Sequence, residues 1–358
     1  MHLRGLIGQP RAVEALEGAH ASERFHPSLI FHGPPGVGKL TTAVALARAL
    51  LCRESDPPCG ECHSCRRIDA RSQRHPDLMV VFPEKLDDYR KGETDEGVAG
   101  IDLQEKQEAA ATSPGWNLIV DRIRDAIAFV QRRPVEGARS MLVIDQAQRL
   151  TAEGANALLK TIEEPPEHAV IALLATSLHS LLPTIRSRCR AVPFQSLPPH
   201  AIADWLVSEQ QVPEAEARLR AALSGGRIGA AMGLDLQAFR ARRDALLTAL
   251  ESFLRPPDAG RALARAEEIA KGESPEADLE ILTSLVRDRM IVATGRGQAP
   301  GLIHADVLGR LKTLPLSGGP DGTEALHALE SALEGLRRRG NRQLLIENAF
   351  LGFLPPAS

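Results

Sequence analysis

The chain has 358 residues, a formal net charge of −3, and 43% hydrophobic, 25% charged and 3% aromatic residues. This length predicts two or three domains, and the composition is that of an ordinary globular protein. The small net charge provides no global attraction to nucleic acid. The N-terminus lacks the apolar core of a signal peptide, and no window approaches 18 apolar residues. We therefore expect no membrane segment and a cytoplasmic protein.

The first predicted elements are a helix over residues 11–24, a buried strand over 28–32 and a helix over 39–52. Between the strand and the second helix lies HGPPGVGK, which follows the phosphate-loop pattern G-x-x-x-x-G-K. Such a loop holds phosphate because backbone N–H groups and a helix N-terminus converge on it, while the lysine adds a charge. The candidate nucleotide-binding residues here are Gly33, Gly36, Gly38 and Lys39.

The next position of this pattern is altered. Leu40 stands where a Ser or Thr hydroxyl usually binds the magnesium of the nucleotide. Thr41 is not a simple substitute, because one step along a helix rotates a side chain by about 100°. The sequence leaves two possibilities open: passive binding of ATP or ADP, or a loop that now only connects a strand to a helix.

A cluster of four cysteines follows the second helix, in the stretch CRESDPPCGECHSC. Cys52, Cys59, Cys62 and Cys65 have the spacing C-x6-C-x2-C-x2-C. In a cytoplasmic chain such clustering indicates metal before disulfide, and four thiolates suit tetrahedral zinc. Because four thiolates close the coordination shell, we predict a structural zinc rather than a catalytic one.

Two segments after this cluster have a less specific composition. Arg66, Arg67, Arg71 and Arg74 follow the last cysteine and could contact DNA or a partner, although a solvated helix face is the simpler interpretation. Residues 84–116 interrupt the α/β pattern, with nine acidic and four basic residues within 84–108. We predict a flexible surface insertion over 84–116.

Two further buried strands are predicted over 140–145 and 169–176, with helices over 117–132 and 151–164. Apolar runs without alternation, separated by helices, indicate an α/β fold with a parallel sheet. After FQSLPP the chain becomes helical to its end.

The strand over 140–145 ends in the stretch VIDQAQ. ATP-hydrolysing enzymes usually carry an acidic pair at this position, with one carboxylate near magnesium and the next polarising the attacking water. Asp145 retains the first carboxylate, whereas Gln146 replaces the second. An amide is not a useful general base near pH 7. Leu40 and Gln146 therefore both predict that hydrolysis is lost, while neither removes the phosphate loop itself.

Four stretches, IGQPRAVEAL, GPPGVGK, NALLKTIEEPP and TIRSRCR, together resemble the clamp-loader branch of the AAA+ ATPases. The stretch from LIFHGPPGVGK to RRIDARSQRHPDL resembles the bacterial DNA polymerase III clamp-loader subunits. The resemblance covers most of residues 1–200. It implies an AAA+ P-loop domain with a parallel sheet and an inserted zinc module over 1–197, a small helical lid over 198–240, and an all-helical collar over 241–358.

The resemblance also implies roles for individual residues. Residues 7–9 would line the adenine pocket, and Thr176 matches the sensor position at the end of its strand. Arg188, in TIRSRCR, matches the arginine finger, which acts on the nucleotide of a neighbouring subunit. Arg227 lies near the position of a second sensor arginine, but its register does not match convincingly.

Within this family the motor subunits keep the hydroxyl and the acidic pair, so Leu40 and Gln146 favour a non-hydrolysing member of the five-subunit ring. The implied partners are the gamma/tau motor subunits and the delta subunit, and, through the assembly, the sliding clamp and primer-template DNA. Three alternatives are an active ATPase motor of the same family, a stand-alone zinc-containing nucleic-acid-binding protein and, more remotely, a small-molecule P-loop kinase.

Overall fold

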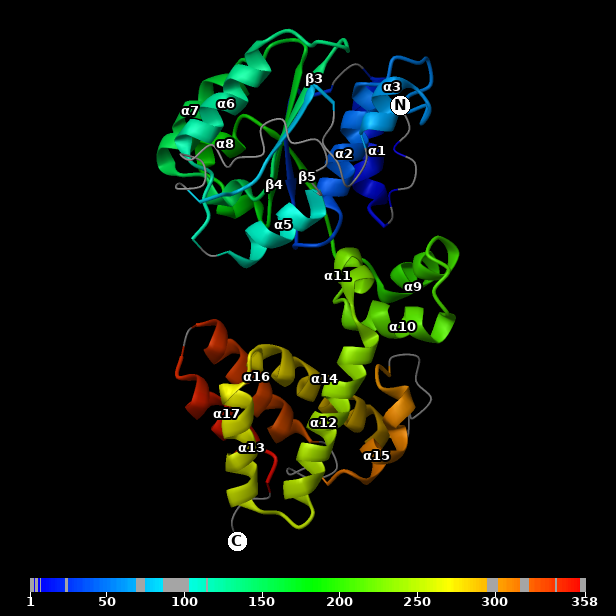
Figure 1. The fold of residues 1–358 in the computed structure, drawn as a ribbon, viewed down its shortest axis with the longest axis vertical. Helices are drawn as coiled ribbons and strands as arrows, with labels where there is room; N and C mark the ends of the chain where they lie inside the picture. Colours follow the sequence, from blue (N-terminus) through cyan, green and yellow to red (C-terminus); the bar gives the residue numbers. More distant parts are fainter. Residues whose placement is uncertain are drawn as a thin grey trace. The chain divides into compact units, whose positions relative to one another are not determined.

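The structure is a computed structural model that describes residues 3, 6, 8–22, 25–68, 75–85, 103–113, 115–294, 302–315, 322–338 and 340–354. The chain divides into two compact units, Met1–Ala217 with Ser224–Met232, and Arg218–Leu223 with Gly233–Ser358 (Figure 1). Among the described residues, no helix combines the length and the apolar character needed to cross a bilayer.

The first unit is built on a parallel sheet of five strands in the order β2-β3-β4-β1-β5. The strands are β1 (Ser28–His32), β2 (Leu78–Val81), β3 (Ser140–Ile144), β4 (Ala169–Ala175) and β5 (Arg190–Pro193). The sequence predicted β1, β3 and β4, and every residue of β3 and β4 is buried, as apolar runs without alternation predict. The predicted α/β class with a parallel sheet is confirmed.

Helices cover both faces of this sheet (Figure 1). Because successive strand residues point to opposite faces, Phe31 of β1 joins the core beneath α1 and α2, while Ile30 joins the core beneath α6 and α7. On the first face lie α1 (Pro10–Ala21), α2 (Lys39–Leu50) and α3 (His63–Arg67); on the other lie α6 (Val120–Gln131), α7 (Ala152–Glu163) and α8 (Pro183–Arg186). The loops that follow β1, β3 and β4, which carry the candidate site residues, lie at the carboxyl ends of these strands.

Two helix boundaries differ from the predicted ones for a local reason. The helix predicted from residue 117 begins at Val120, because Asn117 and Leu118 instead form bridges to Glu84 and Leu150. The helix predicted over 39–52 ends at Leu50, and the chain then leads Cys52 into the cysteine cluster.

Part of the segment predicted as a flexible insertion forms a docked helix, α5 (Leu103–Thr112). Leu103 and Ala110 are buried, and Leu103 belongs to the same core as helix α2. The Arg149 guanidinium donates to the carbonyl oxygens of Ala110 in the last turn of α5 and of Ser113 and Trp116 beyond it, at 2.8 to 3.4 Å. The bond to Ala110 satisfies an acceptor that a helix end leaves unpaired. Residues 86–102 of the predicted insertion lie outside the described residues.

Helices α9 (Pro199–Ser208), α10 (Glu214–Leu223) and α11 (Ile228–Gly233) follow the sheet. The second unit is helical, with α12 (Leu236–Leu254), α13 (Ala259–Lys271), α14 (Pro275–Ala293), α15 (Leu308–Thr313), α16 (Thr323–Arg337) and α17 (Arg342–Leu351). Its core includes three aromatic rings, Phe253, Phe350 and Phe353, whose centroids lie 5.6 to 6.3 Å apart. The helical C-terminal region is therefore as the sequence predicted.

Candidate functional site

The candidate phosphate loop joins β1 to α2 over residues 33–38. Gly36 has a φ of 73°, a conformation that side chains other than glycine rarely adopt. The Gly33 N–H donates to the Ala175 carbonyl of β4, at 3.2 Å, so the loop starts directly beside the end of the neighbouring strand. The carboxyl ends of β1, β3 and β4 thus bring the loop, Asp145 and Thr176 to one edge of the sheet.

The Lys39 side chain is turned onto its own loop. Its Nζ atom donates to the carbonyl oxygens of Gly33 and Pro34, at 2.6 Å each, and the residue is 8% exposed. Burial lowers the pKa of Lys39 to about 8, against which the nearby Asp145 carboxylate acts. The ammonium that would meet a phosphate is here held by two carbonyl groups.

Leu40 packs into the core of the first unit and is 5% exposed, so its side chain leaves no hydroxyl at the loop. Thr41 is exposed, and the Thr42 hydroxyl donates to the Gly38 carbonyl at 2.9 Å. Neither threonine takes the place of the missing ligand, because Thr42 is already committed to the backbone of its own helix. The hydroxyl that usually binds magnesium is therefore not replaced by Thr42.

Asp145 is 2% exposed and lies at the end of β3. Its Oδ2 atom accepts a hydrogen bond of 3.1 Å from the Gln107 side chain of α5. Burial raises the pKa of Asp145, whereas the Gln107 amide and the Lys39 ammonium oppose that rise. Gln146 follows with a φ of 49°. The carboxylate expected near a cation is thus already paired with a neutral side chain of the same chain.

Two residues expected to line the adenine pocket, Gly8 and Gln9, are packed against other parts of the chain. Gln9 is 6% exposed, and its amide Nε2 donates to the carbonyls of Val37 and Gln195, at 3.2 and 2.7 Å. The Leu197 side chain lies against Gly8, where an added Cβ would meet it at 1.7 Å. Residue 7, the remaining position of the expected pocket, lies outside the described residues.

Two more of the predicted positions border the loop. The Thr176 N–H donates to the Gln148 side chain at 3.4 Å, just beyond β4. Arg227 lies closer to the loop than the sequence indicated: its side-chain carbons are 3.2 to 3.7 Å from where a Cβ on Gly36 would lie. Its Nε atom donates to the Ser224 carbonyl at 3.0 Å. The structure therefore brings Arg227 to the phosphate loop.

Arg188 lies just beyond α8, with about a third of its side chain exposed. Its guanidinium forms an ion pair with Glu163 of α7 at 3.0 Å and donates to the Thr184 carbonyl at 3.2 Å. Among the described residues, its remaining hydrogen bond is to the Ser187 hydroxyl. None of these partners belongs to the phosphate loop. The guanidinium is instead held by residues around α7 and α8, with part of its side chain exposed to solvent.

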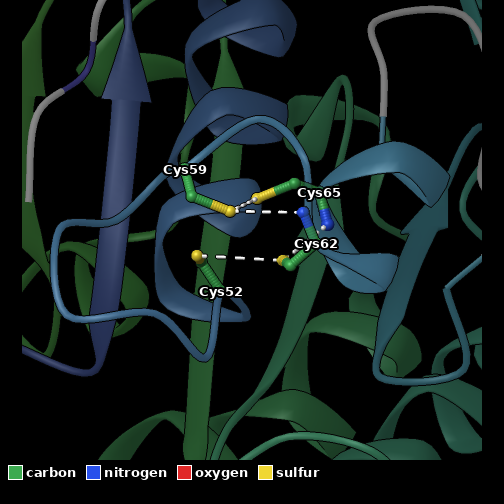
Figure 2. A group of neighbouring side chains, drawn as sticks. All are labelled: Cys52, Cys59, Cys62 and Cys65. Atoms are coloured by element: carbon green, nitrogen blue, oxygen red, sulfur yellow. Dashed lines mark hydrogen bonds between the residues drawn. The ribbon is translucent and has the colours of Figure 1, made fainter.

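The four cysteines of the predicted metal site converge (Figure 2). Their sulfur atoms all lie within 4.8 Å of one another, with 3.9 Å between Cys52 and Cys62 and between Cys59 and Cys65. Tetrahedral coordination with metal–sulfur bonds of about 2.3 Å places sulfur atoms about 3.8 Å apart, whereas a disulfide needs about 2 Å. The arrangement fits a bound metal ion and not a pair of disulfides.

Backbone amides support two of these sulfurs. The Cys62 N–H donates to Cys59 Sγ at 3.3 Å, and the Cys65 N–H donates to Cys62 Sγ at 3.4 Å, where Cys62 caps helix α3. Backbone N–H groups, first that of Cys62 and then that of Glu61, lower the pKa of the Cys59 thiol to about 7. Donors of this kind favour a thiolate, which is the form that binds metal.

Side chains beside the cysteines join the module to the segments that precede β2 and β3. The Ser64 hydroxyl is bonded to buried His75 at 3.1 Å, and Arg67 pairs with Glu136 at 2.6 Å. Arg67 is thus engaged within the chain, and Arg66 is exposed. The other two arginines of the predicted cluster, at 71 and 74, lie outside the described residues.

The Asp77 carboxylate holds the loop that carries Glu136. It accepts hydrogen bonds of 2.6 to 2.9 Å from the backbone N–H groups of residues 135–137, and Asp77 is 2% exposed. Burial alone would raise the pKa of Asp77, but these three donors outweigh it, so the pKa lies below its ordinary value of 3.8. The ionised form is therefore the one that stabilises the fold.

We expect Asp77→Ala to lower the free energy of unfolding by about 2 kcal/mol at neutral pH, because three backbone donors lose a charged acceptor. A lowered folded-state pKa gives stability that is present above the unfolded pKa and is lost as the pH falls through the folded pKa. The difference between wild type and variant should therefore shrink below pH 3.8. Urea unfolding over a pH series measures this.

The control is Asp121→Ala, which removes an exposed ion pair with Arg124 and should change the free energy of unfolding by about 0.5 kcal/mol or less. A pH-independent difference would contradict the assignment.

Sequence reasoning missed the contribution of α5 to this site. Gln107 is a polar residue within an acidic segment, and no pattern links it to Asp145, 38 positions further along the chain. Two indications of the helix were available: the run of strong helix formers LQEKQEAAA, and the apolar residues Leu103 and Ala110, whose spacing of seven places them on one face of a helix.

The comparisons with known proteins agree over the α/β part. The family described as "DNA polymerase III, delta subunit" matches residues 8–198, which is more than half of the chain. The DNA polymerase III delta-prime subunit of Bacillus subtilis is 33% identical over 214 residues, covering 60% of this chain and 55% of that protein. The delta-prime subunit of Pseudomonas aeruginosa is 31% identical over 242 residues, covering 66% of this chain and 64% of that protein.

The DNA polymerase III gamma/tau subunit of Mycobacterium tuberculosis is also similar, 31% identical over 210 residues that cover 58% of this chain and 31% of that protein. The chain spans about half the length of the first curated relatives it matches. Among solved structures, a gamma-subunit-related protein of Thermotoga maritima overlaps with a TM-score of 0.40 at 18% identity, covering 94% of this chain and 97% of that chain. The chain therefore belongs to the DNA polymerase III delta-subunit family, with delta-prime subunits among its relatives.

Proposed function

We propose that this protein is the delta-prime subunit of a bacterial replicative clamp loader. It would be a non-hydrolysing member of a ring that opens the sliding clamp and places it on primer-template DNA. The observation that carries the proposal is the family match over residues 8–198, combined with Leu40 and Gln146 at the two positions that hydrolysis needs. The partners would be gamma/tau motor subunits and a delta subunit. The chain would contact them through a helical collar over 241–358, and residues 198–240 would form a small helical lid.

Arg188 would supply an arginine finger to the nucleotide of the neighbouring subunit. Its own site lacks the cation ligand and the second carboxylate, so a guanidinium there has no hydrolysis to assist. Support for a role in trans comes from the position of Arg188, whose side chain is partly exposed and is oriented by an ion pair with Glu163. Gly33, Gly36, Gly38, Lys39, Asp145 and Thr176 would form a vestigial nucleotide site.

The cysteine cluster would bind one structural zinc ion. Support comes from four sulfurs at tetrahedral spacing, from the two backbone N–H donors, and from the ties of the module to His75 and Glu136. Zinc suits an all-thiolate set, and four protein ligands leave no open position for catalysis. When bound, the ion would join the chain after α2 to helix α3.

We expect the isolated chain to show negligible ATP turnover. Loss of either the cation ligand or the water-activating carboxylate costs on the order of 100-fold or more. A steady-state ATPase assay, with a gamma/tau subunit as the positive control, measures this. Turnover comparable to that motor would contradict the proposal and favour the alternative of an active ATPase. The double variant Leu40→Thr with Gln146→Glu asks whether the rest of the site remains competent.

A stand-alone nucleic-acid-binding protein is the alternative from another class. It predicts tight binding of primer-template DNA by the monomer, which the net charge of −3 does not support. We expect DNA binding only by the assembled ring. Fluorescence anisotropy of a labelled primer-template, with the chain alone and with the assembly, separates the two functions.

A further inference from the structure

Helix α5 approaches the phosphate loop at the end of the sheet where β3 and β4 end (Figure 1). The helix reaches the site through Gln107, whose amide donates to Asp145 at 3.1 Å. Asp145 is the carboxylate that would face the cation of a bound nucleotide. It follows β3, which pairs with β4, and the Ala175 carbonyl of β4 accepts a hydrogen bond from the Gly33 N–H of the loop at 3.2 Å. The Gln107 amide therefore occupies an oxygen of the carboxylate that would face the cation.

The helix is anchored in this position at both ends. Near its start, Leu103 is 1% exposed within the core that also contains Val37 and Leu40 of the loop region. Towards its end, Ala110 is fully buried and its carbonyl accepts from Arg149 at 2.8 Å. These contacts make α5 part of the core of the first unit rather than a surface appendage.

The other groups that would bind a nucleotide are satisfied by the chain as well. Lys39 is bonded to two loop carbonyls, and the amide of Gln9 bridges the loop to Gln195. A phosphate would have to compete with the Gly33 and Pro34 carbonyls for the Lys39 ammonium. A magnesium ion would in addition have to displace Gln107 from Asp145.

We propose that helix α5 is an intramolecular ligand of the vestigial nucleotide site, so that docking of α5 and binding of a magnesium nucleotide exclude each other. The neutral Gln107 amide satisfies the buried Asp145 carboxylate without a metal ion, and the docked helix therefore stabilises the nucleotide-free arrangement of the site. The proposal concerns the isolated chain and does not depend on a role in clamp loading.

Linkage sets the size of the expected effect. If α5 competes with nucleotide, the apparent affinity equals the intrinsic affinity multiplied by the fraction of molecules in which α5 is undocked. Loss of one hydrogen bond to a carboxylate shifts such an equilibrium by about tenfold. Gln107→Ala should therefore bind nucleotide about tenfold more tightly than the wild type.

The experiment uses the full chain and a fluorescent ADP analogue, N-methylanthraniloyl-ADP, titrated with magnesium. Gln107→Ala and Gln107→Glu are compared with wild type, since a second carboxylate beside Asp145 also repels α5 by like charge. Ala111→Ser, at an exposed position of the same helix, is the matched control and should bind as wild type does. Adding Lys39→Ala to Gln107→Ala should remove the gained binding, because the phosphate loop would lose its charge.

Hydrogen exchange of the peptides that contain residues 103–112 gives a second readout that does not require binding. These peptides should exchange about tenfold faster in Gln107→Ala than in wild type, and still faster when the analogue is added. Tighter binding together with faster exchange supports the proposal. It is overturned if Gln107→Ala and Gln107→Glu bind no more tightly than wild type, or if the analogue binds while exchange of α5 is unchanged.

Discussion

Replacement of Arg188 by alanine should leave the assembled ring intact and lower its clamp- and DNA-stimulated ATP turnover. An arginine that reaches the γ-phosphate of a neighbouring subunit stabilises charge developing in the transition state, and fingers of this kind contribute about 1,000-fold or more in GTPases. Turnover at the one site that faces this subunit should fall by about that factor. Because the other sites keep their own fingers, the loss in steady-state turnover of the whole assembly should be partial.

The measurement is single-turnover ATP hydrolysis and clamp loading by the reconstituted assembly. Arg190→Ala, an exposed arginine two residues further along, is the matched control and should behave as wild type. The ion pair of Arg188 with Glu163 is partly exposed, so its loss should change the unfolding free energy by about 1 kcal/mol or less. An intact mutant assembly that loads clamps at the normal rate would show that Arg188 is only a structural residue.

Removal of the metal should have the largest effect on stability. Structural zinc sites in small peptides contribute about 10–16 kcal/mol of apparent binding energy. Here the sheet already supports the module, so we expect Cys59→Ser or prolonged chelation to cost a smaller share, on the order of 3–5 kcal/mol. The loss should extend to helix α3, because Cys62 caps that helix and Cys65 lies within it.

Metal analysis of protein purified without added zinc, combined with thermal unfolding, checks this prediction. We expect about one zinc ion per chain. Cys189→Ala is the matched control, since Cys189 lies outside the cluster and should not change the metal content. A zinc-to-protein ratio near zero with the fold intact would contradict the zinc assignment.

The elements that the sequence predicted share strong local patterns. Strands β1, β3 and β4 are buried apolar runs, and the short spacing of the cysteines leaves little freedom in how they can meet. Strands β2 and β5 were not predicted. Each has four residues, and β5 reads Arg-Ala-Val-Pro with its first and last residues exposed at the edge of the sheet.

The docked position of helix α5 could not be predicted, because long-range contacts hold it in place. Its own residues, LQEKQEAAAT, are mostly strong helix formers, but they lie in a segment whose acidic residues and glycines suggested a loop. Its position depends on Arg149 and Asp145, which come from a different part of the chain. In the same way, the altered residues Leu40 and Gln146 indicated a site without hydrolysis, but only the structure shows that Lys39 and Gln9 are satisfied within the chain.

The most direct test of the account is the native mass of the assembly formed when this chain is co-expressed with the gamma/tau-type and delta-type subunits of its own organism. The account predicts a stable five-subunit complex that contains one copy of this chain and loads a sliding clamp onto primed DNA only when that copy is present. A chain that remains monomeric beside a ring of the other subunits, or a ring without it that loads clamps at the full rate, would contradict the account.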